Sequence, residues 1–277
     1  MDTTRANRVA RHYGPAELHA RIADGLRALG LDPDRLQPAD LGLVDQFHTG
    51  GRAATLALAD LAGLRPGMRV IDLGGGLGGP ARTLAAERGC DVTVLDLSEE
   101  FCRTGERLTA ATGLSGQVRF HSGDALAAPF DDGSFDVVWT QHSTMNIEDK
   151  GGLYREVHRL LGPDGLFAMH EVAAGSGSQP IAFPVPWAAD PDISFLERST
   201  RMRALILAAG FAEVTWRDLT AESVAFYRER AADAARDAPP LGIHILLGPA
   251  VGECFRNLVQ NGEEERIAVV QGVFRRT

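Results

Sequence analysis

The chain has 277 residues and an ordinary globular composition, so it is long enough to bury a substantial core. Its formal net charge of −9 argues against a broad electrostatic grip on nucleic acid, because the phosphates would be repelled. The three cysteines lie far apart without a Cys-x-x-Cys pair, so the sequence indicates neither a disulfide framework nor a zinc site.

The sequence shows no secretion signal and no apolar run long enough to cross a membrane. We therefore expect a cytoplasmic protein that binds neither membranes nor nucleic acid, and the sequence leaves a homo-oligomer open. Residues 1–50 are predicted to form an N-terminal helical cap. Within the cap, residues 16–29 carry apolar side chains at helical spacing, and Gly30, Pro33 and Pro38 interrupt that pattern.

From residue 51 onward, predicted strands alternate with predicted helices. This order predicts an α/β domain over residues 51–277, with a doubly wound, mostly parallel sheet of seven strands and helices on both faces. The last strand is expected to enter antiparallel, and the proline- and glycine-rich residues 172–197 are expected to form a lid insertion. The expected strands cover 68–73, 92–95, 118–121, 135–140, 166–170, 213–217 and 266–274; the expected helices cover 53–64, 79–87, 98–112, 151–161, 201–209, 221–235 and 249–260.

A glycine-rich turn follows the first predicted strand of this domain. It reads Asp72-Leu73-Gly74-Gly75-Gly76-Leu77-Gly78-Gly79 and leads into a helix. Glycines let backbone N–H groups approach a ligand closely, and the helix N-terminus favours that approach. The turn fits the dinucleotide pattern G-x-G-x-x-G and also the acidic pattern D-x-G-x-G-x-G. It therefore predicts an adenosine-containing cofactor without deciding which one.

Further motifs follow in a fixed order. Asp96 ends the second strand, Gly123-Asp124-Ala125 follows the third, residues 132–136 read Asp-Gly-Ser-Phe-Asp, and Pro163-Asp164-Gly165 precedes the fifth strand. From about residue 45 to its end, the chain resembles the class I S-adenosylmethionine-dependent methyltransferases. The resemblance implies their Rossmann-like fold and S-adenosyl-L-methionine as the cofactor.

An acid at the tip of the second strand is suited to accept hydrogen bonds from both ribose hydroxyls, which assigns that role to Asp96. The resemblance implies that Asp124 and Ala125 contact adenine and that Asp72 lies near the amino group of the methionine part. The complete predicted cofactor set is Asp72, Gly74, Gly76, Gly78, Asp96, Leu97, Asp124, Ala125, Gln141 and Gln46.

The substrate side rests on residues outside the glycine turn. His142 and His170, at the ends of the fourth and fifth strands, are the predicted catalytic residues, because a histidine can assist deprotonation of the acceptor. The predicted substrate contacts are Tyr13, Met145, Phe183 and Trp187, and no metal is predicted.

Residues 45–51 and 141–147 loosely resemble those of the glycine, sarcosine and dimethylglycine N-methyltransferases. The expected function is methyl transfer from S-adenosylmethionine to a nitrogen or oxygen of a small molecule. An NAD(P)-dependent oxidoreductase stays open, because it shares the first turn and the ribose acid. A catalytically silent protein that binds the cofactor and a partner also stays open.

Overall fold

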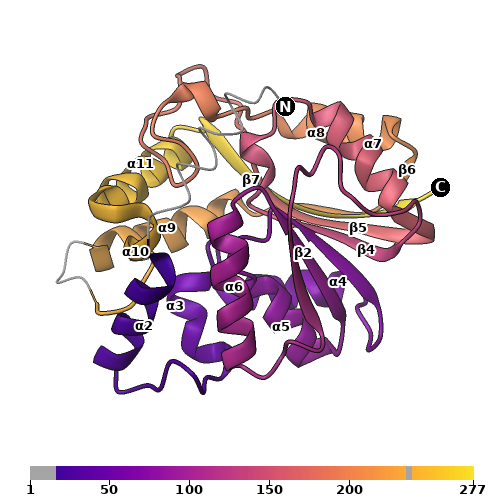
Figure 1. Cartoon of the computed structure of the whole chain (residues 1–277). Helices are drawn as coiled ribbons and strands as arrows, with labels where there is room; N and C mark the ends of the chain where they lie inside the picture. The colour runs from indigo at the N-terminus through magenta and orange to yellow at the C-terminus, as the bar shows by residue number, and fades with distance from the viewer. Residues whose placement is uncertain (1–16, 235–238) are drawn as a thin grey trace.

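The structure is a computed structural model that describes residues 17–234 and 239–277. Its centre is a twisted seven-stranded sheet with the strand order β3-β2-β1-β4-β5-β7-β6 (Figure 1). Strand β7 runs antiparallel to both of its neighbours, and the remaining pairings are parallel. The predicted Rossmann-like doubly wound sheet with an antiparallel C-terminal strand is therefore confirmed.

The sheet is built from strands of five to 14 residues. The strands are β1 (Arg69–Leu73), β2 (Asp91–Asp96), β3 (Val118–Ser122), β4 (Phe135–Gln141), β5 (Leu161–Ala174), β6 (Phe211–Asp218) and β7 (Ile267–Arg276). The α-helices of the described chain are α2 (Leu18–Ala28), α3 (Gly42–Asp45), α4 (Gly51–Leu61), α5 (Gly79–Arg88), α6 (Glu99–Ala111), α7 (Lys150–Leu160), α8 (Ser199–Ala208), α9 (Thr220–Ala234), α10 (His244–Leu247) and α11 (Val251–Glu263).

Helices cover both faces of the sheet, as the alternation of side chains along each strand requires. In β1, Ile71 and Leu73 pack into a cluster with α7 and α8, whereas Val70 packs into a cluster with α4 and α5. Helix α2 lies against α6 and α10 (Figure 1), and its Leu18 and Ile22 are fully buried there. Segments from both ends of the chain therefore cover the same side of the domain.

Several predicted boundaries differ from the structure, and the largest difference is in β5. Strand β5 runs from Leu161 to Ala174 instead of 166–170, because it pairs with β7 as far as Ala174. The first residues of the expected 172–197 insertion are thus part of the sheet. The last predicted helix begins later, at Val251, because residues 248–250 form a 3-10 turn. The division into a cap and one domain at residue 50 stays a prediction.

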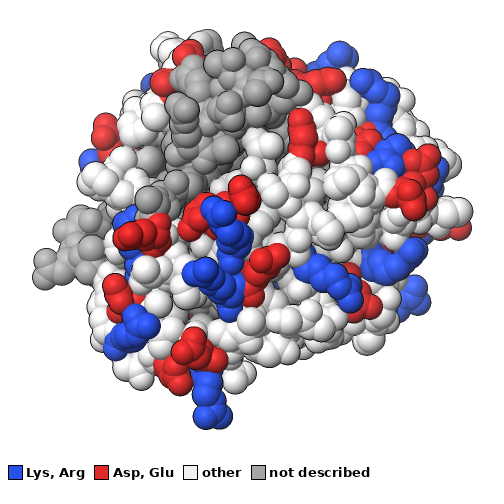
Figure 2. All heavy atoms as spheres, in the orientation of Figure 1, with Lys and Arg blue, Asp and Glu red and all other residues white. Residues whose placement is uncertain are grey.

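The segment after β5 packs against helices near the end of the chain. Trp187 is buried in a cluster with Tyr227 of α9 and Phe255 of α11. On the face drawn in Figure 2, acidic and basic side chains are interspersed, without a broad basic area among the residues shown in colour. Within the described ranges, no helix has the length and apolar character needed to cross a membrane.

Candidate active site

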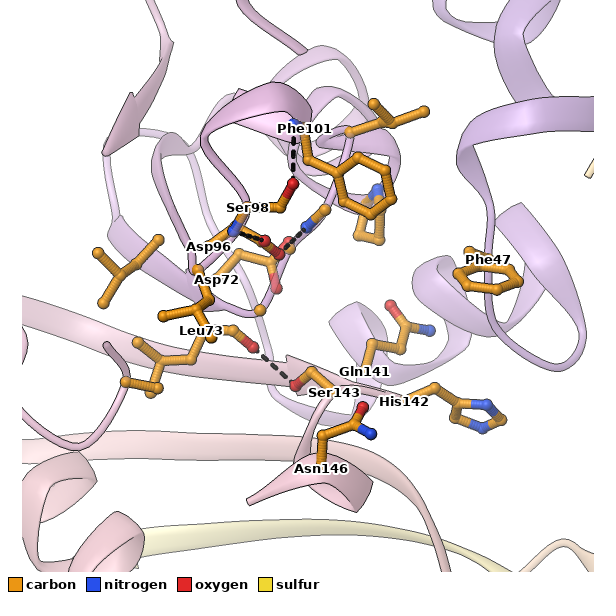
Figure 3. Close-up of a pocket in the computed structure, with 18 of the residues that line it drawn as sticks. Phe47, Asp72, Leu73, Asp96, Ser98, Phe101, Gln141, His142, Ser143 and Asn146 are labelled. Atoms are coloured by element: carbon orange, nitrogen blue, oxygen red, sulfur yellow. Dashed lines mark hydrogen bonds between the residues drawn. The ribbon is translucent and has the colours of Figure 1, made fainter. Parts of the chain in front are cut away.

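A cavity opens where the carboxyl ends of the central parallel strands meet (Figure 3). The turn after β1 forms its floor, and the ends of β2, β3 and β4 contribute side chains to its walls. This edge is where open α/β sheets bind ligands. The predicted cofactor residues on its wall are Asp72, Gly74, Gly76, Asp96, Leu97, Asp124, Ala125 and Gln141.

Asp96 holds the glycine turn and the start of α6 together. Its two carboxylate oxygens accept hydrogen bonds from the backbone N–H groups of Gly76, at 2.9 Å, and Ser98, at 2.8 Å (Figure 3). Burial raises the pKa of Asp96, and these two hydrogen bonds oppose that shift. A carboxylate has about four lone-pair positions, so two acceptor positions remain for hydroxyl groups of a ligand.

Asp72 lacks a compensating partner. Its Oδ2 is enclosed without a hydrogen bond, and the side chain is 1% exposed. Burial raises the pKa of Asp72 to about 8, and repulsion from Asp96 and Glu171 adds to the shift. Because a buried charge is costly without a counter-charge, this carboxylate is suited to a positively charged group in the cavity.

Gln141 presents an N–H donor group whose orientation its neighbours fix. Trp139 Nε1–H, which only donates, and the Thr55 hydroxyl both donate to Gln141 Oε1 at 3.1 Å. The amide nitrogen Nε2 is therefore the free end, and it is buried without a partner. Figure 3 shows Gln141 on the side of the cavity opposite Asp96, so a donor and an acid face one ligand space.

Two predicted cofactor residues lie off this wall. Gly78 has φ +77°, and a Cβ there would lie 2.5 Å from Cζ of Phe120, so this glycine permits α5 to begin against β3. Gln46 lies on a second cavity, where its Nε2 donates to Thr83 Oγ1 at 3.4 Å. Direct cofactor contact by either residue stays a prediction.

A turn after β4 carries His142 in the left-handed region, with φ 52°. Oε2 of the buried Glu171 accepts from the backbone N–H groups of Ser143 and Thr144, each at 3.2 Å, and so holds this turn. Burial raises the pKa of Glu171 to about 7. Burial also pushes the pKa of His142 well below its ordinary value, and the neighbouring histidines add to this effect. His142 is therefore neutral near pH 7.

A second cavity, of about 350 Å³, adjoins the first. Phe47, His48 and His142 line both, so the two spaces meet at these side chains. Apolar and aromatic side chains dominate the second wall, including Met145, Trp187, Phe226, Tyr227, Phe255 and Leu258. Its one cationic side chain among the described lining residues is Arg230, which pairs with Asp233 at 2.8 Å. Such a lining favours a largely uncharged guest.

Of the remaining predicted substrate and catalytic residues, some line a cavity and others lie in the core. Met145 and Trp187 lie on the second cavity, whereas Phe183 packs into the cluster under the insertion and lines neither cavity. His170 is 1% exposed, its ring centroid lies 4.9 Å from that of His142, and neither ring nitrogen has a partner. Burial lowers its pKa to about 3. Tyr13 lies outside the described residues.

Phe47 was not predicted as a site residue, whereas the sequence indicated His48, together with Gln46, as a residue that can reach the methionine part of the cofactor. Backbone packing brings their segment to the cavity: a Cβ at Gly79 would overlap the carbonyl of Asp45, so α3 lies directly over the start of α5. A buried ion pair of 2.8 Å between Asp45 and Arg82 fixes this contact. The signal available was the short spacing, since Phe47 and His48 are the two residues that follow the predicted cofactor residue Gln46.

No group of three histidine, cysteine or acidic side chains in the described part of the chain is arranged to hold a metal ion. The three histidines near the junction of the cavities are no exception. Their ring centroids are 4.9 Å apart for His142 and His170, and His48 lies 6.4 Å from each.

Residues 71–169 match the family described as "Methyltransferase domain". Over these residues the chain is similar to methyltransferase domains. Over 114 residues it is 38% identical to a sterol 24-C-methyltransferase of Gibberella zeae, a match covering 41% of this chain and 30% of that protein. Over 121 residues it is 37% identical to a glycine/sarcosine/dimethylglycine N-methyltransferase of Actinopolyspora halophila, covering 44% and 21%. The matched part is less than a third of each relative, and the predicted resemblance is confirmed for this domain.

Solved structures extend the likeness of the methyltransferase domain to the whole fold. A geranyl diphosphate C-methyltransferase from Streptomyces coelicolor A3(2), solved with S-adenosyl-L-homocysteine, has a TM-score of 0.73 at 19% identity, covering 100% of this chain and 99% of that one. The cyclase SpnF has a TM-score of 0.67 at 22% identity, covering 95% and 98%. At these identities the likeness shows a common fold, which hosts more than one chemistry.

Proposed function

We propose that this chain is an S-adenosylmethionine-dependent methyltransferase that acts on a nitrogen or oxygen of a small, largely apolar molecule. The observation that carries the proposal is the junction of the two cavities at Phe47, His48 and His142. One cavity has the acids and the free amide of a cofactor site, and the other has an apolar wall for an acceptor. A methyl group held at the junction would face both the cofactor and the acceptor.

The unpartnered polar atoms fit the proposed cofactor. The carboxylate of Asp72 would hold the ammonium group, the free Nε2 of Gln141 would donate to the carboxylate, and Asp96 would accept from the ribose hydroxyls. Asp124 and Ala125, on the wall beyond Asp96, would contact adenine. When bound, the cofactor supplies a methyl group on a sulfonium, which an acceptor atom attacks in line.

The side chains around the junction contribute orientation and exclusion of water. The neutral ring of His142 adds no positive charge near a sulfonium, and Glu171 keeps that ring in place through the turn after β4. Trp187 and Met145 form the apolar wall on which the body of an acceptor packs. Positioning in a dry cavity supplies much of the rate of such a displacement.

Two measurements test the proposal. Calorimetry should show S-adenosylhomocysteine binding, and NADH should fail to compete with it. Incubation with S-adenosylmethionine and a panel of phenols, amines and apolar alcohols should then give methylated products by mass spectrometry. Competition by NADH would favour the oxidoreductase alternative, and cofactor binding without any methylated product would favour the silent alternative.

A further inference from the structure

His48 occupies one tautomer, because its hydrogen bonds allow no other. Its Nε2 lies 2.9 Å from the carbonyl oxygen of Gly51, which can only accept, so Nε2 carries the proton. The Thr55 hydroxyl lies 3.1 Å from the same nitrogen and donates its own hydrogen to Gln141. Its oxygen therefore accepts from His48 as well, which reinforces this assignment.

The other ring nitrogen, Nδ1, is a lone-pair acceptor without a partner among the residues that the structure describes. Every hydrogen bond of His48 in the structure uses Nε2, and Nδ1 is not sealed from the cavities. The residue lines both cavities at their junction, although only 5% of its surface is exposed. An acceptor on a cavity wall without a protein partner is free to accept a hydrogen bond from a guest in that cavity.

The surroundings of His48 keep the ring neutral. Burial lowers the pKa of His48 to about 4, and the hydrogen bond to Gly51 opposes this shift only in part. His142 and His170, whose ring centroids are each 6.4 Å away, are also held neutral by burial. Near pH 7 the junction therefore offers Nδ1 as an uncharged acceptor.

We infer that His48 is a specificity-determining residue: its Nδ1 accepts a hydrogen bond from an O–H or N–H group of the methyl acceptor. The inference rests on the proposed function and narrows its substrate class. The acceptor has an apolar body that packs on Trp187 and Tyr227, and it has a donor group that reaches the junction. A molecule of the same shape without that donor leaves Nδ1 unpaired and binds less tightly.

The test compares 2-naphthol, which carries a hydroxyl donor, with naphthalene, which does not. Each probe is titrated by calorimetry into the full chain saturated with S-adenosylhomocysteine. We expect 2-naphthol to bind about tenfold more tightly than naphthalene, the size of one buried hydrogen bond. In His48→Phe, whose ring keeps the aromatic shape but has no lone-pair nitrogen, this advantage should fall below about twofold while naphthalene affinity is retained.

Two further readouts separate the inference from a structural role and from the cofactor proposal. Nitrogen NMR of the wild-type complex should show His48 protonated at Nε2 and not at Nδ1, and 2-naphthol should shift the Nδ1 resonance. Equal affinity for both probes, failure of both to bind, protonation at Nδ1, or an unchanged advantage in His48→Phe would each overturn the inference. Failure of S-adenosylhomocysteine to bind would instead overturn the proposed function on which it rests.

Discussion

The two cavities differ in how far apart in the sequence their lining residues lie. The first cavity, the proposed cofactor cavity, is built mainly where successive strands end, by the turn after β1 and by residues just after β2, β3 and β4. The second cavity, the proposed acceptor cavity, draws on residues 42–51, the insertion after β5, and helices α9 to α11. A local motif describes the first, whereas the second exists only after distant segments have packed together.

The cavities also differ in charge. Asp72 is buried and Asp96 half-buried at the cofactor cavity, and desolvation raises the pKa of both. On the acceptor cavity, Arg230 and Asp233 neutralise each other. The first cavity is therefore prepared for a guest with a positive group, and the second for a guest without net charge. Methyl transfer requires both guests at once, and their common boundary is Phe47, His48 and His142.

The largest expected effect comes from breaking the ion pair that serves both cavities. Asp45 and Arg82 are each 1% exposed at the side chain, and their contact holds residues 42–48 over the start of α5. Arg82→Met should lower the free energy of unfolding by about 3–5 kcal/mol, because it leaves a buried carboxylate unpaired. Denaturant unfolding followed by circular dichroism measures this loss.

The double variant Asp45→Leu with Arg82→Met is the matched control, because it removes both charges. It should be more stable than Arg82→Met alone. If the double variant were the less stable of the two, the ion pair would not account for the loss.

The second-largest expected effect concerns ligand binding in the cofactor cavity alone. Asp96→Ala should weaken binding of S-adenosylhomocysteine about 100-fold, since two hydrogen bonds to a charged acceptor are lost. Calorimetry measures this change. Asp136→Ala is the control, because Asp136 lies at the opposite end of the parallel strands, half-exposed and paired with Arg69 at 2.7 Å. Equal weakening by both substitutions would show that Asp96 acts on the fold and not on the ligand.

The sequence predicted the fold and most of the cofactor wall because both follow from local patterns. Apolar strands separated by helices require a parallel sheet, and the acid that ends β2 must lie beside the turn after β1. The register pairs Asp72 with Val94 and Leu73 with Leu95, which brings Asp96 next to the glycine turn. Neither feature depends on a distant segment.

The acceptor wall was predicted only in part, since its residues share no local pattern. Trp187 and Phe183 both lie in the insertion, but only Trp187 reaches the cavity, because Phe183 packs against the cluster under that segment. Tyr227 was not predicted as a site residue. Its hydroxyl hydrogen-bonds to Thr49 at 2.7 Å, a contact between residues 178 positions apart in the chain. No spacing in the sequence indicates that pairing.

A third prediction addresses the acceptor wall alone. Trp187→Ala should weaken both naphthalene and 2-naphthol about tenfold, because a large aromatic surface is lost from the wall. Affinity for S-adenosylhomocysteine should stay within about twofold, since Asn146 holds the backbone carbonyl of residue 187 and not its side chain. Phe183→Ala is the control, and it should lower stability without changing the affinity for either probe.

The smallest expected effect is a pH dependence that arises in the cofactor cavity. Burial raises the pKa of Asp72 to about 8 in the free protein, so this carboxyl is largely protonated at pH 6.5. The ammonium group of the cofactor favours the ionised form. Binding at pH 6.5 therefore requires loss of a proton, and affinity for S-adenosylhomocysteine should rise several-fold between pH 6.5 and 8.5.

Asp72→Asn tests whether that carboxyl is the source. The variant should bind more weakly at pH 8.5 and lose most of the rise, while the wild type should release a proton on binding at pH 6.5, seen as a buffer-dependent enthalpy. Glu171 is the other acid nearby, and burial raises its pKa to about 7. Because Glu171 holds the turn of His142 and lies outside the cavity wall, Glu171→Gln should keep the rise. If the rise in affinity with pH were lost in Glu171→Gln but kept in Asp72→Asn, the titrating group would be Glu171, which holds the turn after β4, and not Asp72 in β1.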